Sequence, residues 1–329
     1  MDLDLQKLVQ GVLNRDHRSL ARAITYVEEE RPAAEGILQS LLPYQGRALC
    51  VGVVGPFGTG KSTLIDALVK WFRGEGKWVA VVAVDPSSPI SGGAVLGDRV
   101  RMTEHSRDPG VFIRSMASRG RLGGLAKATR AAIRILDAAG YDIIFVETVG
   151  AGQSDIEISS AADVVIVVLM PQLGDQIQSL KAGLLEVGDL YVINKADMEN
   201  AKLTEAILRT TLGRRAASNI VFSTVATRGE GIDALARGIV QIYTQLKESG
   251  VIEARRRARV EREIREHLLV HLESRLLHYL SNSAEYRDMV QKVLEGSLDA
   301  VSAARSLLEK ISFNLEWGAE MKQGSKAAT

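Results

Sequence analysis

The stretch that most constrains the fold is Cys50–Thr63, which reads CVGVVGPFGTGKST. It matches the phosphate-loop pattern G-x-x-x-x-G-K-[ST], in which a glycine-rich turn and a helix N-terminus direct several backbone N–H groups at one phosphate. An apolar run precedes the turn and apolar residues at helical spacing follow it, so the strand–turn–helix context that confirms the motif is present. We therefore predict a nucleoside-triphosphate site formed by Gly55, Gly58, Thr59, Gly60, Lys61, Ser62 and Thr63.

Side chains around this loop are predicted to bind phosphate and metal. Lys61 should reach the β- and γ-phosphates, and the Ser62 hydroxyl should hold Mg²⁺. The run DIIFVETVG is an apolar strand that ends in Glu147, which we expect to hold Mg²⁺ directly or through water. Asp85 and Asp98 lie on a Pro- and Gly-rich segment after another predicted strand. There, metal-shell and water-positioning roles are about as well supported as a plain surface loop.

The base of the nucleotide is predicted from Asn194-Lys195-Ala196-Asp197, which directly follows an apolar strand. This is the N-K-x-D pattern of guanine specificity. The Asp197 carboxylate can accept from the guanine N1–H and the exocyclic amine, Asn194 can contact the other edge, and the Lys195 stem can lie over the ring. Adenine does not present the same two donors, so it would leave buried polar groups unpaired.

The bulk composition is that of an ordinary globular protein. The chain has 329 residues, 46% of them apolar and 25% charged, with a net charge of +1. The charge balance argues against nucleic acid or an anionic membrane as partner. The single cysteine, Cys50, excludes a disulfide framework and a Cys-based zinc site. No apolar run is long enough to span a membrane and no signal-like segment begins the chain, so we expect a cytoplasmic protein.

Periodicity divides the chain into three parts. Residues 1–45 are predicted to form helices, and in residues 46–246 apolar strands alternate with helical patterns. That alternation predicts an α/β fold with a doubly wound, mostly parallel sheet whose ligands bind at the carboxyl ends of the strands. The predicted strands are Leu49–Val54, Trp78–Val84, Val111–Ile113, Ile143–Val146, Val164–Leu169, Leu190–Ile193 and Ile220–Phe222.

Residues 247–329 are predicted to form a helical arm, rich in Glu, Arg, Leu and Ala. Apolar residues spaced mostly four apart from Val260 to Leu276 form one stripe, which is typical of a helix–helix contact and which we expect to serve dimerisation. The triplet Arg255–Arg257 is surrounded by glutamates, so a solvated helix face is a better interpretation than a nucleic-acid patch. His267 and His271 lack the Glu of the H-E-x-x-H zinc motif and are interpreted as surface histidines.

Several ordered strings together resemble one family. GPFGTGKST, VDPSSPISGGAVLGDRVRM, FIRSMASRGRLGGLA, FVETVGAGQSDIEI and NKAD are similar to the methylmalonyl-CoA mutase-associated GTPases, which are metallochaperone-type P-loop GTPases. The resemblance implies a homodimeric GTPase that binds GTP or GDP with Mg²⁺. It also implies that the chain gates cobalamin loading and protects or reactivates a cobalamin-dependent acyl-CoA mutase, with the adenosyltransferase of that mutase as a further candidate partner.

The same resemblance implies roles for individual residues. Ser62, Asp85, Asp98 and Glu147 would surround Mg²⁺ and the attacking water. Residues 150–153, which begin with Gly150, and residues 173–181 would be switches, with Asp175 and Lys181 coupling nucleotide state to the mutase.

Two departures from the family pattern concern neighbouring loops. Many relatives have Pro-Gly where this chain has Pro171-Gln172, and Val225-Ala226 replaces the usual Ser-Ala of the loop that contacts guanine O6. The backbone N–H of Ala226 can still serve there. No arginine finger is assigned, although Arg114, Arg119 and Arg121 precede the Glu147 strand.

Three other functions compete with this interpretation. A nickel-type metallochaperone GTPase would need a Cys or His cluster, whereas this chain has one Cys and five scattered His. A small-molecule kinase would transfer phosphate to an acceptor other than water. A scaffold would keep its nucleotide as a structural element without turnover.

Overall fold

A computed structural model describes residues 3–85, 105, 107–117, 124–148, 160–171, 182–213 and 220–314. The chain divides into two compact units, Met1–Arg259 and Val260–Thr329. The first unit contains the sheet, the N-terminal helices and every residue predicted to bind nucleotide.

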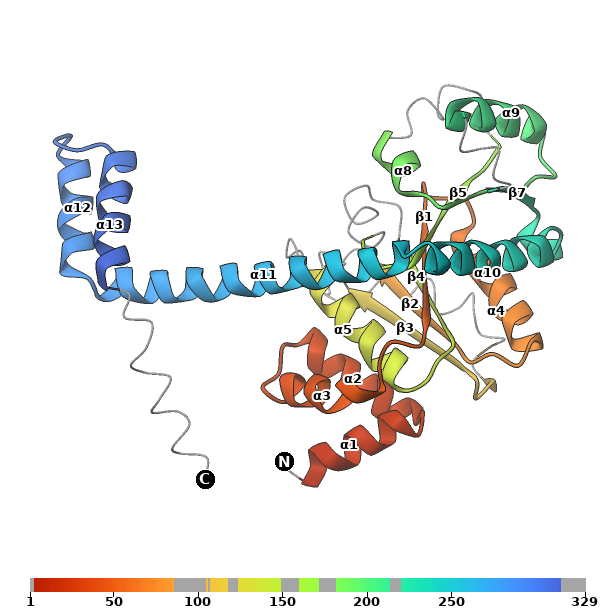
Figure 1. Cartoon of the computed structure of the whole chain (residues 1–329), viewed down its shortest axis with the longest axis horizontal. Helices are drawn as coiled ribbons and strands as arrows, with labels where there is room; N and C mark the ends of the chain where they lie inside the picture. The colour runs from red at the N-terminus through yellow and green to blue at the C-terminus, as the bar shows by residue number, and fades with distance from the viewer. Residues whose placement is uncertain are drawn as a thin grey trace. The chain divides into compact units, whose positions relative to one another are not determined.

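Within the described residues, seven strands form one parallel sheet in the order β3-β2-β4-β1-β5-β6-β7 (Figure 1). The strands are β1 Leu49–Val54, β2 Val79–Asp85, β3 Val111–Ala117, β4 Ile143–Thr148, β5 Val164–Leu169, β6 Leu190–Asn194 and β7 Val221–Thr224. The strands that follow β1 as far as β4 lie on one side of it, and β5 to β7 lie on the other. The crevice for a ligand in such a sheet is at the carboxyl ends, where the strand order reverses. The predicted α/β fold is therefore confirmed.

The strand predictions were right in position but short at several carboxyl ends. β3 and β4 continue past their apolar runs into Arg114, Ser115, Glu147 and Thr148, and β6 includes Asn194. Parallel pairing depends on backbone hydrogen bonds, which polar residues make equally well. The strand can therefore continue where its side chains turn from the core toward a polar site.

The helices and short 3-10 turns of the described residues are α1 Leu3–Leu13, α2 His17–Glu28, α3 Ala33–Leu41, η1 Leu42–Tyr44, α4 Lys61–Gly74, α5 Gly124–Ala138, α8 Ala182–Val187, α9 Ala201–Leu212, η4 Ala226–Arg228, α10 Ile232–Glu248, α11 Val251–Asn282, α12 Ala284–Leu294 and α13 Ala300–Asn314. Within the described part of the chain, no helix is both long and apolar enough to span a membrane.

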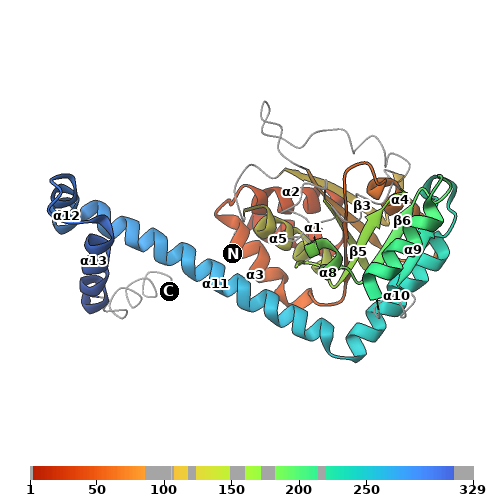
Figure 2. The same ribbon diagram turned by 90° about the horizontal axis from the view of Figure 1, so that it is seen from above.

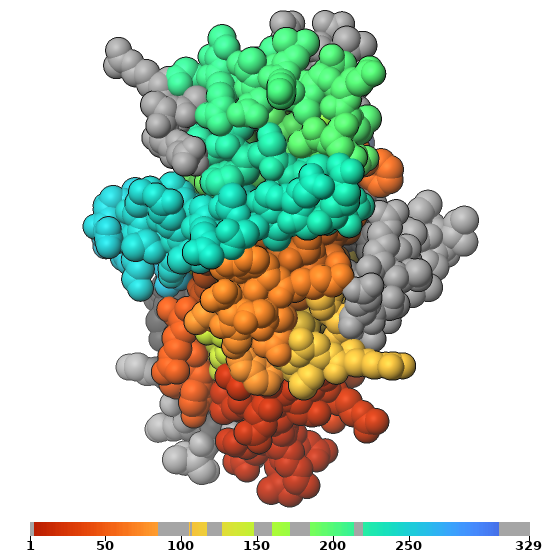
Figure 3. Space-filling view, turned by 90° about the vertical axis from the view of Figure 1, so that its right-hand side faces the viewer, coloured from red at the N-terminus to blue at the C-terminus, as the bar shows by residue number. Residues whose placement is uncertain are grey.

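Helices cover both faces of the sheet (Figure 2). Phe72 of α4 contacts the ring of Phe145 on β4, whereas His17 of α2 contacts Phe112 on β3. The register aligns Phe112 with Ile144, the neighbour of Phe145, and successive residues of a strand point to opposite faces. The α4 face and the α2 face are therefore opposite. On the α4 face, α4 and α10 lie side by side as the orange and teal bands of Figure 3.

The N-terminal helices pack on the sheet and on α5. Arg114 of β3 donates to Thr25 Oγ1 at 3.0 Å and forms an ion pair with Glu28, both on α2. This partly buried arginine is held by the helical layer, which argues against its use as an arginine finger. The other two candidates, Arg119 and Arg121, lie outside the described residues.

The first turns of α11, which belong to the first unit, are held against the starts of β5 and β6 by three arginines. Arg255 makes a bidentate pair with Asp189 at 2.7 and 2.8 Å, while Arg256 and Arg259 both bind the buried Asp163 at 2.9 and 2.6 Å. The predicted solvated face holds for Arg257, which is exposed, but the prediction missed the ion pairs of Arg255 and Arg256. Their partners precede β5 and β6 and lie more than 60 residues away in the sequence, so the glutamates nearby in the helix were not informative.

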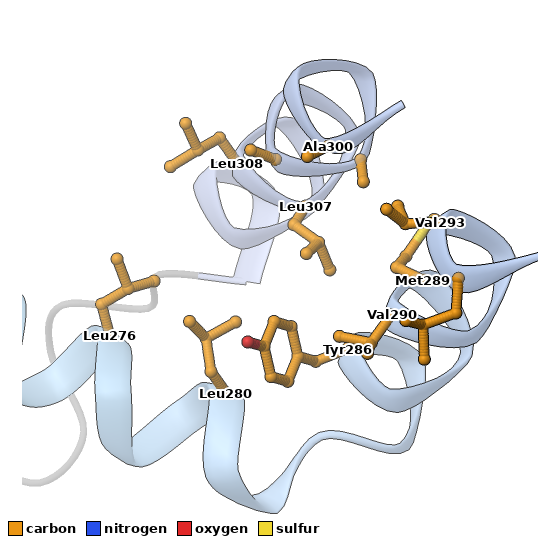
Figure 4. Close-up of a pocket in the computed structure, with 12 residues that line it drawn as sticks. Leu276, Leu280, Tyr286, Met289, Val290, Val293, Ala300, Leu307 and Leu308 are labelled. Atoms are coloured by element: carbon orange, nitrogen blue, oxygen red, sulfur yellow. The ribbon is translucent and has the colours of Figure 1, made fainter. Parts of the chain in front are cut away.

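The second unit contains the rest of α11 with α12 and α13. An apolar groove of about 420 Å³ lies between these helices, and Leu280, Tyr286 and Leu307 point into it (Figure 4). Four of the five residues of the predicted stripe on α11 are exposed: Val260, Ile264, Leu268 and Leu272 have 51%, 55%, 53% and 43% of their surface accessible. The fifth, Leu276, lines the groove.

Candidate nucleotide site

The phosphate loop connects β1 to α4, at the crevice end of the central strand. Three of its glycines have positive φ: Gly55 at 142°, Gly58 at 82° and Gly60 at 86°. A Cβ on Gly55 would lie 2.2 Å from the carbonyl oxygen of Val168, and one on Gly60 would lie 2.5 Å from Asn194 Nδ2. Glycine is therefore required at positions 55 and 60, because the loop packs directly against the ends of β5 and β6.

Lys61 is the first residue of α4, and its side chain is buried. Its Nζ donates to the carbonyl oxygens of Gly55 and Pro56 at 2.8 and 3.1 Å, so the ammonium group lies across the mouth of the loop. Within the turn, Thr59 Oγ1 donates a hydrogen bond to the Pro56 carbonyl oxygen at 3.0 Å. A cation beside a helix N-terminus makes the loop a strong anion site.

A buried pair of oxygen donors lies just behind the loop. Ser62 Oγ donates to Glu147 Oε1 at 2.7 Å, and both residues are buried. The register pairs Glu147 with Val53 of β1 and with Ala83 of β2, so β4 delivers its carboxylate between the two neighbouring strand ends. A hydroxyl and a carboxylate are the hard oxygen ligands that Mg²⁺ prefers, so the donor set fits that ion.

Other predicted metal and switch residues are described only in part. Asp85 ends β2 two positions beyond the residue paired with Glu147, and the description of Asp85 covers its backbone only. Asp98, Gly150 and the predicted switches at 150–153 and 173–181 lie outside the described residues.

Asn194 ties three separate segments together at the end of β6. Its Nδ2 donates to the Thr59 oxygen at 2.9 Å, and its Oδ1 accepts from Thr224 Oγ1 at 3.1 Å and from the Ala226 N–H at 3.2 Å. The side chain is only 2% exposed. In this structure Asn194 holds the phosphate loop and the Ala226 loop in register, and the Ala226 N–H predicted for guanine O6 is bonded to it.

Lys195 and Asp197 lie on the open side of the same region. Lys195 has a left-handed backbone, with φ of 59°, and its Nζ donates to the Gly58 oxygen at 2.8 Å. Its stem thus runs alongside the phosphate loop. Asp197 is half-exposed, and its Oδ2 lies 3.3 Å from Arg228 Nη2. The carboxylate is accessible to a base, with a guanidinium beside it.

The loop residues, Glu147 and the N-K-x-D residues therefore converge at one end of the sheet, as the carboxyl ends of parallel strands require. Sequence reasoning missed Thr224 and Arg228. Both flank Ala226, and the position of that loop directly after the strand next to β6 was the signal that could have drawn attention to them.

A phosphate loop on the central strand of a parallel sheet, with an N-K-x-D segment after a nearby strand, defines a P-loop GTPase. The chain belongs to the family whose model is described as methylmalonyl Co-A mutase-associated GTPase MeaB, which matches residues 20–280. The family predicted from the sequence strings is thus confirmed, and so is its GTPase class.

Full-length relatives support this assignment. A Pyrococcus horikoshii protein with a provisional GTPase name is 46% identical over 314 residues, covering 93% of this chain and 98% of that one. GTPase ArgK of Escherichia coli is 35% identical, covering 93% and 95%. The mouse protein named methylmalonic aciduria type A homolog, mitochondrial, is 34% identical, covering 93% and 79%.

A solved structure agrees with the fold. A crystal structure described as an LAO/AO transport system kinase is 29% identical to this chain. It superposes with a TM-score of 0.69 and covers 95% of this chain and 99% of its own.

Proposed function

We propose that this GTPase serves a cobalamin-dependent acyl-CoA mutase of the methylmalonyl-CoA type, gating cofactor loading and protecting or reactivating the mutase. The description of its family supports this role, as does the name of its mouse relative. The observation that carries the nucleotide part is the assembly of Lys61, the Ser62–Glu147 pair and Asn194 around one glycine loop. The adenosyltransferase of the mutase is a further proposed partner.

Each part of this site has a task in the proposed hydrolysis. The loop N–H groups and Lys61 would hold the β- and γ-phosphates and stabilise charge on the transferring group. Ser62 and Glu147, with Asp85 and Asp98, would hold Mg²⁺, which when bound neutralises charge on the phosphate oxygens. The carboxylates that do not contact the metal directly would orient the attacking water, and the Gly150 N–H would sense the γ-phosphate.

The base would be bound at the end of β6. Asp197 would accept from guanine N1–H and the exocyclic amine, and the Lys195 stem would cover the ring. Asn194 would act through the two loops that it connects, and the Ala226 N–H would exchange its present acceptor for guanine O6. Asp197→Asn should therefore weaken GTP and favour xanthosine triphosphate. Unchanged GTP affinity would refute the base-reading role.

Turnover in the presence of the mutase tests the partner role. We expect slow GTP hydrolysis by the full chain alone and faster hydrolysis when a methylmalonyl-CoA mutase is added, because partners accelerate such enzymes by ordering their switches. Lys61→Ala should abolish both rates. Equal rates with and without a mutase that co-purifies with the chain would refute gating and leave the GTPase assignment intact.

The exposed stripe on α11 supports a homodimer, since a row of apolar side chains on one helix face is typical of a helix–helix contact. Leu268→Glu, at the centre of the stripe, should shift the molar mass in solution from dimer to monomer. Leu203→Glu on α9 is the control, because Leu203 is also 53% exposed. A dimer that survives Leu268→Glu would argue that another surface is used.

Kinase activity is a second candidate, favoured by the description of the solved relative as a transport system kinase. A kinase would transfer phosphate to an acceptor, whereas a hydrolase releases one inorganic phosphate per GTP consumed. A ratio of one would exclude the kinase. A nickel metallochaperone would need a cluster of metal ligands, and the described residues contain no group of three or more His, Cys, Asp or Glu side chains suited to a metal ion. A titration that detected no tight stoichiometric nickel site would exclude that alternative.

A further inference from the structure

The loop after β7 is a tight turn that fixes the backbone of Arg228. Val225 and Glu230 form an antiparallel bridge, with the Val225 N–H donating to the Glu230 oxygen at 3.0 Å. The Arg228 N–H donates back to the Val225 oxygen at 2.9 Å, and Gly229 closes the turn with φ of 72°. A Cβ on Gly231 would lie 2.3 Å from the Ser223 oxygen, so the turn also packs closely against the end of β7.

The Arg228 side chain bridges two carboxylates. Its Nε lies 2.9 Å from Glu230 Oε1 within the turn, and its Nη2 lies 3.3 Å from Oδ2 of Asp197, which lies on the segment after β6. All three side chains are about half-exposed, with 54%, 59% and 45% of their surface accessible. Exposed ion pairs contribute little to folding stability, so the contact matters more for the orientation of Asp197 than for holding the fold together.

We propose that Arg228 is a positioning and specificity-determining residue for the guanine base. Reading N1–H and the exocyclic amine together requires both oxygens of Asp197 to lie in the plane of the base. A half-exposed carboxylate rotates freely unless one oxygen is held. The Arg228 guanidinium attracts Asp197 Oδ2 from one side as an ion pair at 3.3 Å, and the two carboxylate oxygens remain able to accept from the two guanine donors.

The hydrogen-bonding chemistry of Arg228 also determines which groups it can contact. A guanidinium only donates, so it holds the carboxylate as an acceptor and does not compete for the donors of the base. Glu230 anchors the guanidinium from the other side, so Arg228 remains over Asp197 when the site is empty. This inference depends on the proposed role of Asp197, and its test must separate the two.

The experiment measures dissociation constants of GDP and IDP for the full chain. Inosine lacks the exocyclic amine, so IDP makes only one of the two contacts to Asp197. Arg228→Gln should weaken GDP by about two- to fivefold, the range expected for one exposed charged contact, and should weaken IDP less. In an Asp197→Asn background the Arg228→Gln change should have no further effect. Arg237→Gln, which removes an exposed arginine paired with Asp233 on α10, is the matched control and should leave both constants unchanged.

The outcomes distinguish the two claims. If Asp197→Asn leaves GDP affinity unchanged, the base-reading role itself fails. If Asp197→Asn weakens GDP but Arg228→Gln does not, or makes it tighter, only the role of Arg228 is overturned. Glu230→Gln gives an independent test should the arginine variant fail to fold. It frees the guanidinium from its other anchor and should also weaken GDP more than IDP, and an equal effect on both would contradict the inference.

Discussion

Replacing Asp163 with Asn should destabilise the first unit strongly, because this carboxylate is almost completely buried and shared by two guanidinium groups. Asp163 is 2% exposed and precedes β5. Its carboxylate accepts hydrogen bonds from Arg256 Nη2 at 2.9 Å, from Arg259 Nη2 at 2.6 Å and from the Cys50 N–H at 3.3 Å. Asn keeps the volume of the side chain and removes its charge, so the two arginines lose their common counter-ion.

The magnitude follows from this geometry. Removing one partner of a buried ion pair costs roughly 3–5 kcal/mol, because the remaining charge is left uncompensated. The Arg256 and Arg259 side chains are 37% and 18% exposed, so water can solvate part of what they lose. We therefore expect the lower end, about 3 kcal/mol. That is a large share of the roughly 5–15 kcal/mol by which a domain is stable.

Urea unfolding measures this loss. Trp71 and Trp78 lie in the first unit, so their fluorescence in a Trp317→Phe background reports on that unit. Glu30→Gln, which removes an exposed carboxylate paired with Lys127, is the control and should leave the midpoint unchanged within error. A midpoint for Asp163→Asn that matches this control would refute the argument.

The pH dependence gives a second test of Asp163. Burial alone would raise its pKa, but the hydrogen bond and charge of Arg256 and the charge of Arg259 outweigh burial and lower it. A carboxyl whose folded pKa lies below its unfolded value contributes stability that is complete above about pH 4 and is lost as the pH falls through the folded pKa. The stability gap between the wild type and Asp163→Asn should therefore be constant from pH 7 to about pH 5 and should narrow below about pH 4. A gap that stays constant down to pH 3 would contradict a paired, ionised Asp163.

Three further changes probe the phosphate loop and the core beneath it. Gly55→Ala should abolish GTP binding and lower the free energy of unfolding by about 1–3 kcal/mol, because a φ of 142° disfavours a side chain and the added Cβ would overlap Val168. Gly74→Ala is the neutral control, because a Cβ there meets no atom within 4 Å. If the two variants have the same urea midpoint and the same GTP affinity, Gly55 is not required by the close contact with Val168. Ser62→Ala should raise the Mg²⁺ concentration needed for half-maximal hydrolysis, since it removes the hydroxyl beside Glu147; an unchanged Mg²⁺ titration would remove Ser62 from the metal site. The Cys50 thiol should react with a disulfide reagent only in urea, because burial, helped by the charge of Asp163, raises its pKa to about 12; rapid labelling of the native chain at pH 8 would contradict that burial.

The sequence was sufficient for those parts of the molecule whose signals are contiguous. Short apolar runs, several of them unbroken Val and Ile, identified all seven strands that the structure describes, since strands covered on both faces need no polar alternation. The phosphate loop was equally clear, because its glycines, Lys61 and Ser62 must be consecutive to enclose one phosphate.

The parts that could not be predicted depend on partners that the fold brings from a distance. The N-K-x-D pattern located Asn194 but not its task, because its bonds to Thr59, Thr224 and Ala226 span 135, 30 and 32 residues. The ion pairs of the arginines at the start of α11 could not be predicted for the same reason. Arg255 and Arg256 neutralise acids that are buried only once β5 and β6 have joined the sheet.

Strands β5 and β6 connect these two sets of contacts. β5 begins next to Asp163, and its Val168 carbonyl lies against Gly55. β6 begins next to Asp189 and ends at Asn194. Both strands are buried along their whole length and paired to each other. Sliding β5 would break the ion pairs of Asp163 at one end and open a gap under the phosphate loop at the other. We therefore expect rearrangements driven by GTP hydrolysis to leave these strands, and the first turns of α11 bound to them, in place.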